Sequence, residues 1–257
     1  MSESVARIIA VANQKGGVGK TTTSVNLGAC LAECDQRVLL VDCDPQGNAS
    51  SGFGIQKSAL DQTIYEVLIG GVDIHDAIQH TDYKVHVVPA NINLAGAEIE
   101  LVSTISRESR LKKALDGVRE EYDYILVDCP PSLGLLTLNG LTAADSVLMP
   151  IQCEFYALEG VSQLMNTIQL VKNNLNPSLT IEGVLMTMYD SRTKLSEQVV
   201  AEVRENFKDA VYQTMIPRNV RLSEAPSYGQ PILAYDARSK GAEVYMALAR
   251  EVFQRGK

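Results

Sequence analysis

The sequence predicts an α/β fold, a single domain in which a mostly parallel, twisted sheet carries helices on both faces. Apolar runs rich in β-branched residues recur along the chain, helical patterns separate them, and a glycine-rich loop joins the first run to the first helical pattern. Strands that are apolar on both faces and alternate with helices form parallel sheets buried between helical layers. Ligands of such sheets bind beyond the carboxyl ends of the strands, so functional residues are expected there.

The pattern places each element in turn. Strands are expected over 7–12, 37–43, 84–88, 124–129, 146–151, 181–188 and 211–216. Helices are expected over 21–34, 92–102, 109–118, 158–174, 197–207 and 242–254. Amphipathic patterns over 61–71 and 91–102 fit either a partner surface or helices packed on the sheet, and the sequence leaves both interpretations open. No repeat or linker interrupts residues 1–257, so one domain is expected.

Composition limits the possible functions. With 46% hydrophobic and 21% charged residues, the chain has the composition of a globular protein. No apolar run approaches the ~20 residues of a membrane span, and residues 1–4 show no signal peptide, so a cytoplasmic location is expected. The net charge of −8 argues against a surface coated with nucleic-acid-binding charge, but it allows a local basic patch. The five scattered cysteines are expected to be core residues rather than metal ligands.

The organising motif is a glycine-rich loop between the first strand and the first helix. Glycines bring several backbone N–H groups onto one anion, and the helix N-terminus, Lys20 and the Thr21 hydroxyl add a dipole, a charge and a Mg²⁺ ligand. In the ordinary Walker pattern a glycine stands where this chain has Gln14, and the extra Lys15 opens the loop. A nucleotide phosphate site is therefore predicted at Gln14, Lys15, Gly16, Gly17, Val18, Gly19, Lys20, Thr21 and Thr22.

Acidic residues end two of the predicted strands. Asp42 and Asp44 follow the second strand in a turn with proline and glycine, and Asp128 ends the strand over 124–129. Beside a phosphate site, Asp128 is expected to orient Mg²⁺ through its water shell and Asp42 to support it. Acids that merely open a turn are the alternative interpretation, and it is weaker next to the glycine loop.

Three motifs together resemble the ParA/MinD superfamily of P-loop NTPases, and especially its ParA/Soj group. They are the lysine-first loop Lys15-Gly16-Gly17-Val18-Gly19-Lys20-Thr21, the stretch from Asp44 to Asn48, and the stretch from Asp128 to Ser132. The resemblance implies that ATP and Mg²⁺ bind here, that Lys15 reaches the partner's nucleotide across a homodimer, and that Lys15, Lys20 and Asp44 are catalytic, with Asp44 holding the attacking water. It also implies that Pro217 and Asn219, after the last strand, cradle adenine.

The same resemblance also implies binding to nucleic acid. Relatives bind double-stranded DNA nonspecifically through basic loop residues, which correspond here to Arg192, Lys194, Arg218, Arg221, Arg238 and Lys240. Few aromatic residues accompany them, which favours phosphate contacts over base stacking. Interleaved acids make a solvated, salt-bridged face the competing interpretation.

The resemblance implies a partitioning ATPase with slow intrinsic turnover. Its ATP dimer is expected to bind DNA on the nucleoid, and a ParB-type partner is expected to stimulate hydrolysis. No separate N-terminal DNA-reading domain is expected. A MinD-like regulator is the first alternative, but the helix over 242–254 leaves no amphipathic tail for a membrane. A small-molecule P-loop enzyme and an adaptor that binds nucleotide without hydrolysis are the others.

Overall fold

A computed structural model describes residues 5–155 and 157–256 of the chain. Residues 1–4, which bear on the expected absence of a signal peptide, lie outside the described residues. Within those residues the strands form one seven-stranded sheet in the order β3-β4-β2-β5-β1-β6-β7, parallel except at β3. They are β1 (Arg7–Val11), β2 (Val38–Asp42), β3 (Gln79–His80), β4 (Val85–Val88), β5 (Tyr124–Asp128), β6 (Ser146–Gln152) and β7 (Thr180–Thr187).

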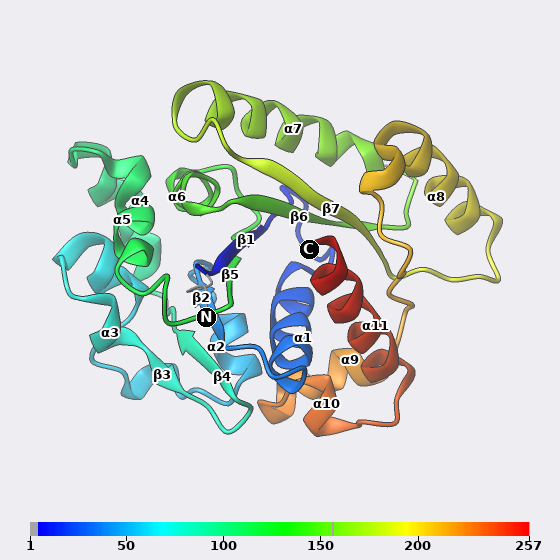
Figure 1. Cartoon of the computed structure of the whole chain (residues 1–257), viewed down its shortest axis with the longest axis horizontal. Coiled ribbons are helices and arrows are strands. Elements are labelled where there is room, and N and C mark those ends of the chain that lie inside the picture. Colours follow the sequence, from blue (N-terminus) through cyan, green and yellow to red (C-terminus); the bar gives the residue numbers. More distant parts are fainter. Residues whose placement is uncertain (1–4, 156, 257) are drawn as a thin grey trace.

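Helices cover both faces of the sheet (Figure 1). The helices are α1 (Lys20–Glu33), α2 (Asn48–Gly52), α3 (Ile74–Ala77), α4 (Leu94–Glu100), α5 (Arg110–Asp116), α6 (Leu135–Ala143), α7 (Ala157–Asn174), α8 (Lys194–Phe207), α9 (Val220–Glu224), α10 (Ile232–Tyr235) and α11 (Lys240–Arg255). One face packs against α1, α11 and the short helices α2, α9 and α10, and the other packs against α3 to α8. The predicted fold class is confirmed.

Each strand contributes side chains to the hydrophobic cores on both faces of the sheet, because successive side chains point to opposite faces. In β1, Ile8 and Ala10 join the core beneath α4 to α8, whereas Ile9 and Val11 join the core beneath α1 and α11. This double burial explains why the strand sequences are continuously apolar instead of alternating.

Two predicted elements differ from the structure. The strand expected over 211–216 is wrong: this segment makes a single isolated bridge to β7, between Val211 and Val184, where Tyr212 N donates to Val184 O; farther on, Ile216 N donates to Met186 O. The helix expected over 61–71 is shorter than predicted. It begins at Ile64 and continues as a π turn, Glu66–Gly70, before Gly71 ends it in the left-handed conformation.

The topology brings the functional strand ends together. Strand β1 lies between β5 and β6, and the register sets Val11 beside Asp128 and Asp42 beside Asp128. The connection from β1 leads through α1 to β2 on one side, while β6 lies on the other side. This change of direction is the switch point at which open α/β sheets bind ligands.

Candidate functional site: a phosphate loop at the sheet switch point

The loop between β1 and α1 has the backbone that anion binding needs. Gly17 and Gly19 have φ of 75° and 88°, in the left-handed region that glycine adopts without strain. At Gly17 a Cβ would meet no atom within 4 Å, so backbone conformation rather than space favours glycine. Gly19 caps the N-terminus of the fourteen-residue helix α1, whose free N–H groups and dipole attract anions.

Neighbouring strands hold this loop in place. The Asn13 amide donates to Pro150 O in β6 at 2.7 Å, and its oxygen accepts from Lys15 N at 3.0 Å. The Thr187 hydroxyl, at the end of β7, donates to Val18 O at 2.8 Å. Sequence reasoning gave Asn13 and Thr187 no role, because their partners are distant in the chain. Their effect is to fix the loop before any ligand binds, which lowers the entropic cost of binding.

Lys20 is the cation of the loop. It is almost fully buried, and its Nζ donates to Lys15 O at 3.0 Å, so this hydrogen bond joins the two ends of the glycine-rich loop. Burial lowers the pKa of Lys20, while the nearby Asp128, Cys129 and Asp44 raise it. An ammonium group that donates only to a carbonyl in the described residues is suited to an anionic ligand.

Asp128 and Asp42 lie side by side, fully buried, at the ends of β5 and β2. Asp128 accepts from Thr21 Oγ1 and from Ser24 Oγ, both at 2.8 Å. Burial and then the neighbouring Asp42 raise the pKa of Asp128, and burial raises that of Asp42. The structure therefore brings Thr21 and Asp128 together, as the sequence predicts.

The Asp42 carboxylate holds the turn that follows β2. Its oxygens accept from Ser50 N at 2.8 Å, Ser50 Oγ at 2.7 Å and Asp44 N at 3.2 Å. Ser24 and Ser50 were not predicted, since a serine inside a helix gives no sequence signal of a bond to a distant acid. The supporting role of Asp42 near a metal stays a prediction.

Asp44 begins the turn itself. Its Oδ1 accepts from Gln46 N at 2.9 Å, and Gly47 N closes the turn by donating to Asp44 O at 2.8 Å. Its Oδ2 makes no hydrogen bond within the described residues. Asp44 is 8% exposed. Its expected catalytic role stays a prediction.

Lys15 lies outside the group formed by Lys20 and the acids. Its Nζ contacts Glu154 Oε2 at 3.0 Å, just beyond the end of β6, and both side chains are about half-exposed. Gln152 also donates to the Glu154 carboxylate. The structure thus gives Lys15 a partner that the sequence did not predict, on a solvent-facing side of the loop.

A cavity of about 510 Å³ lies next to the loop residues Gly19 and Thr22, and Pro217 and Asn219 line it. The Asn219 oxygen accepts from Arg221 N at 2.8 Å and from Leu222 N at 3.4 Å, which caps α9. Its amide nitrogen has no acceptor among the described residues. The position fits the predicted adenine site, whose assignment remains a prediction.

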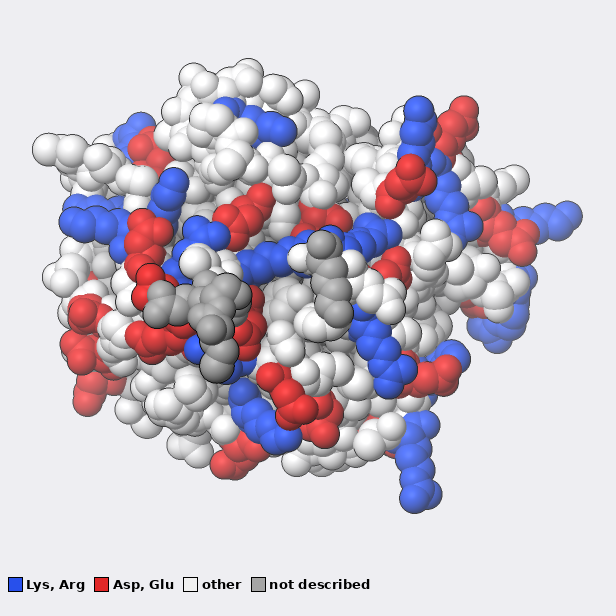
Figure 2. Space-filling view, viewed as in Figure 1, with Lys and Arg blue, Asp and Glu red and all other residues white. Residues whose placement is uncertain are grey.

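The predicted DNA-contact residues divide into two groups. Arg192 pairs with Asp190 at 2.7 Å, Arg221 with Glu224 at 2.9 Å and with Asp236 at 3.6 Å, and Lys240 with Glu243 at 2.8 Å. Within the part of the chain that the structure describes, the remaining three form no ion pair: Lys194, Arg218 and Arg238. On the face in Figure 2, basic and acidic side chains are interspersed, and a row of basic side chains crosses the middle of the view.

The residues present fit Mg²⁺ held chiefly by phosphate. No cluster of three or more histidine, cysteine or acidic residues in the described chain could hold a metal by itself. Magnesium commonly binds through one or two protein ligands plus phosphate oxygens. Thr21 Oγ1 and Asp128, hydrogen-bonded to each other beside the loop, would supply the ligand and the acid for such an ion.

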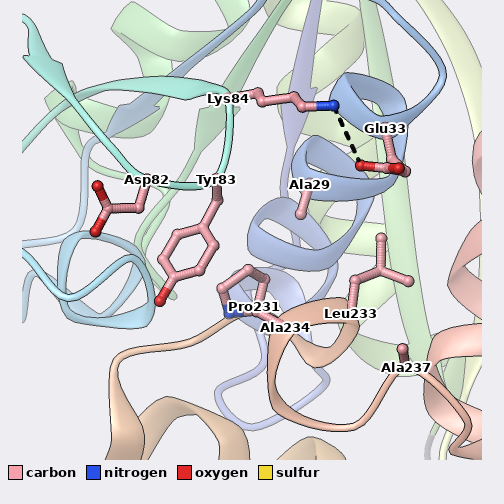
Figure 3. A pocket seen from close by; sticks show the side chains of 9 residues that line it. All are labelled: Ala29, Glu33, Asp82, Tyr83, Lys84, Pro231, Leu233, Ala234 and Ala237. Atoms are coloured by element: carbon pink, nitrogen blue, oxygen red, sulfur yellow. Dashed lines mark ion pairs between the residues drawn. The ribbon is translucent and has the colours of Figure 1, made fainter.

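A further cavity, of about 330 Å³, lies at the opposite end of α1 from the loop (Figure 3). Its lining is mainly apolar, and an ion pair between Lys84 and Glu33 at 3.6 Å lies at one end. Because the phosphate loop is at the N-terminus of α1 and Glu33 is its last residue, this cavity is separate from the candidate site.

The fold and the site together define a P-loop nucleotide-binding protein. Comparisons with known proteins narrow this class. The model of the AAA domain family matches residues 6–181. The chain is 63% identical to the sporulation initiation inhibitor protein Soj of Bacillus subtilis, over 98% of this chain and all of the relative. It is 54% identical to the chromosome partitioning protein ParA of Caulobacter vibrioides, over 99% of this chain and 97% of the relative.

Solved structures of similar fold support the same class of protein. Cobyrinic acid a,c-diamide synthase from Mycobacterium smegmatis, with ADP and magnesium bound, has a TM-score of 0.87 at 43% identity, covering 98% of this chain and 95% of that one. The cell division ATPase MinD of Pyrococcus furiosus has a TM-score of 0.80 at 26% identity, and the match covers 97% of this chain and 99% of that one. This chain belongs to the Soj/ParA family of chromosome-partitioning ATPases. A further structure of that synthase holds an ATP analogue and magnesium. None of the described helices is long and apolar enough to span a bilayer.

Proposed function

We propose that this chain is a dimerising switch that binds DNA without sequence preference in its ATP state and hydrolyses ATP to partition a chromosome or plasmid. Relatives named for chromosome partitioning, from Caulobacter vibrioides and Treponema pallidum, are matched over 97% and 98% of their length. The observation that carries the proposal is the pair of lysines in the loop. The charges of Asp128 and Asp44 act on Lys20 within its own site, whereas Lys15 forms an ion pair with Glu154 on the solvent-facing side of the loop.

The site residues have distinct roles in hydrolysis. The N–H groups of the loop and Lys20 bind the phosphates, and Thr21 with Asp128 holds Mg²⁺. When bound, Mg²⁺ neutralises phosphate charge and polarises the phosphoryl oxygens. Asp44 orients the attacking water through its free Oδ2 and accepts its proton. A single carboxylate positioned by one turn supports slow intrinsic turnover.

Lys15 acts on the nucleotide that a second subunit binds. In the proposed dimer it leaves Glu154 and contacts the phosphates bound by the partner subunit. A cation added there stabilises the charge of the transition state, as an arginine finger supplied in trans does. Dimerisation therefore completes the site, and hydrolysis releases the two subunits.

DNA binding rests on the six basic residues at α8, α9 and the turn before α11. Each phosphate contact releases counterions, and a dimer doubles the number of contacts on one surface. A ParB-type partner bound near the cargo stimulates hydrolysis, so the ATP dimer is depleted there. The protein then works in the cytoplasm, on the nucleoid.

Turnover of ATP tests this function. We expect slow hydrolysis by the chain alone and faster hydrolysis with both random-sequence duplex DNA and the ParB-type protein of the same organism. Asp44→Ala should abolish turnover but retain ATP binding. Turnover that neither addition changes would contradict the proposed switch.

A second candidate function is ATP-dependent amide formation on a small molecule. One observation favours it, the 43% identity to a cobyrinic acid a,c-diamide synthase. ATP consumption that requires cobyrinic acid and ammonia, and whose rate does not depend on DNA, would establish this alternative.

A further inference from the structure

A lysine from outside the predicted site holds the turn that carries Asp44. Lys57 begins the short helical turn Lys57–Ala59, and its Nζ donates to Gln46 O at 2.6 Å. A hydrogen bond from an ammonium group to a carbonyl is charge-assisted, so it is stronger than a bond between neutral groups. Lys57 therefore fixes the C=O end of the peptide group that joins Gln46 to Gly47.

The N–H end of the same peptide group is fixed as well. Gly47 N donates to Asp44 O at 2.8 Å, so this peptide group is hydrogen-bonded through both its N–H and its C=O. The Asp44 carboxylate belongs to the same turn, because its Oδ1 accepts from Gln46 N at 2.9 Å. Hydrogen bonds that follow one another in such a chain strengthen each other. The ammonium group of Lys57 thus reinforces the contacts that orient Asp44.

The side chain of Lys57 also packs against the backbone of the turn. Gly47 has a φ of 61°, and a Cβ there would lie 2.5 Å from Lys57 Cδ and 2.6 Å from Ala90 O. The lysine and the chain that follows β4 therefore meet at Gly47. Ala90 is itself held, because its N–H donates to Ser50 Oγ at 3.0 Å and the Ser50 hydroxyl donates to Asp42 at 2.7 Å.

The surroundings of Lys57 leave its ammonium group to the turn. A cavity of about 510 Å³ beside it is lined by Pro45, Asn91 and Asn93, among others, and none of the described residues that line it is acidic. Lys15 differs in this respect, since it is paired with Glu154. In the lining of this cavity the Gln46 carbonyl thus has no acidic competitor for the Lys57 ammonium.

We propose that Lys57 is a positioning residue for ATP hydrolysis. It holds the peptide group between Gln46 and Gly47, and through it the orientation in which the Asp44 carboxylate acts on water. This inference rests on the proposed function, in which Asp44 is catalytic. Removing the ammonium group should slow the chemical step, because a small misplacement of a catalytic group is costly. Nucleotide binding should not change, because Thr187 and other residues hold the phosphate loop separately.

Amide hydrogen exchange without nucleotide measures the hold on the turn, independently of the proposed function. Lys57→Met keeps a long side chain but removes the ammonium group, and Lys57→Arg keeps a positive charge. We expect exchange at the Gly47 amide to rise by roughly fivefold in Lys57→Met and clearly less in Lys57→Arg. The Ser50 amide, which donates to Asp42 at 2.8 Å, is the internal reference. Unchanged exchange at Gly47, or an equal rise at Ser50, would overturn the positioning role.

Steady-state ATP turnover measures the consequence for catalysis. We expect Lys57→Met to lower kcat by roughly five- to tenfold, with the KM for ATP and the affinity for a nonhydrolysable analogue unchanged. Lys57→Arg should recover most of the lost kcat. Lys84→Met is the matched control, because Lys84 contacts Glu33 at 3.6 Å at the opposite end of α1 from the phosphate loop (Figure 3). This control should keep both constants.

Failure of this inference can be told from failure of the proposed function by including Asp44→Ala. If Asp44→Ala abolishes turnover and Lys57→Met keeps the full kcat, the positioning role is wrong and the proposed function stands. A loss of ATP affinity in Lys57→Met as large as its loss of kcat would also overturn the role, since the lysine would then only stabilise the fold. If Asp44→Ala keeps turnover, the proposed function is wrong about its catalytic carboxylate, and Lys57 holds the turn without a catalytic consequence.

Discussion

Lys15 forms an ion pair with Glu154 at 3.0 Å in the single subunit. The pair lies at the solvent-facing side of the phosphate loop, and it occupies the cation that the proposed dimer needs at the partner's nucleotide. In the proposed dimer, Glu154 would therefore compete with the second subunit for Lys15.

Glu154→Gln is expected to favour dimerisation. An exposed ion pair contributes about 0.2–1 kcal/mol. Because a dimer frees two such lysines, the substitution should strengthen the dimer formed with a nonhydrolysable ATP analogue by roughly two- to thirtyfold. Sedimentation velocity across a concentration series measures this. Lys15→Ala provides the opposite control, with a weaker dimer, and a weaker dimer in Glu154→Gln would contradict the competition.

Asp128→Asn should stabilise the chain without nucleotide while destroying Mg²⁺-ATP binding. Burial and the neighbouring Asp42 raise the pKa of Asp128 above its ordinary value. Its contribution to the free energy of unfolding is then fully present below about pH 4 and is lost as pH rises through the raised pKa. An asparagine carries no charge and avoids that loss.

We expect a gain on the order of 1–2 kcal/mol at pH 8 that shrinks towards pH 4. Urea unfolding at several pH values measures it. A variant that is less stable than the unaltered chain at every pH would show that the hydrogen bonds from Thr21 and Ser24 outweigh the cost of the buried charge.

Gly47→Ala should distort the turn that carries Asp44. Gly47 has a φ of 61°, and a Cβ would lie 2.6 Å from Ala90 O. We expect a loss of about 1–3 kcal/mol of stability and a larger decrease in turnover than in ATP affinity. Gly117→Ala is the control, because Gly117 has a φ of −72° and a Cβ there makes only an ordinary contact at 3.4 Å. Equal effects of the two variants would refute this account of the turn.

Arg218→Ala should weaken DNA binding more than Arg221→Ala does. In the described residues Arg218 forms no ion pair, whereas Arg221 is paired with Glu224 and Asp236. Each lost phosphate contact lowers the slope of log affinity against log salt by about 0.9, and a dimer loses two contacts for each substitution. Fluorescence anisotropy with a random-sequence duplex gives both the affinities and the slopes. The reverse ranking would show that the ion pairs of Arg221 open on DNA.

Much of the fold was predictable because it depends on burial on both faces of a parallel sheet. The strands ending at Asp42 and Asp128 were found from continuous apolar runs, and the loop from its glycines and lysines. Helix α6 was missed because residues 135–143 are apolar nearly all round, with no amphipathic period, since they lie between the sheet and other helices. The strand expected over 211–216 has the right residues but too few hydrogen bonds to β7.

The site was predictable only in its motifs. The glycines and lysines of the loop carry a local signal because they form a motif between a strand and a helix, and Asp42 and Asp128 carry one because each ends an apolar strand. The partners that hold them, such as Ser50 beside Asp42 and Glu154 beside Lys15, come from distant positions and give no signal in sequence.

The central claim is that ATP gates DNA binding, and one measurement tests it most directly. The chain is titrated onto a random-sequence duplex with ADP, ATP or a nonhydrolysable ATP analogue, across a series of salt concentrations. The account predicts binding with the triphosphates alone, falling steeply with salt. Binding that is equal with ADP, or absent with every nucleotide, would contradict it.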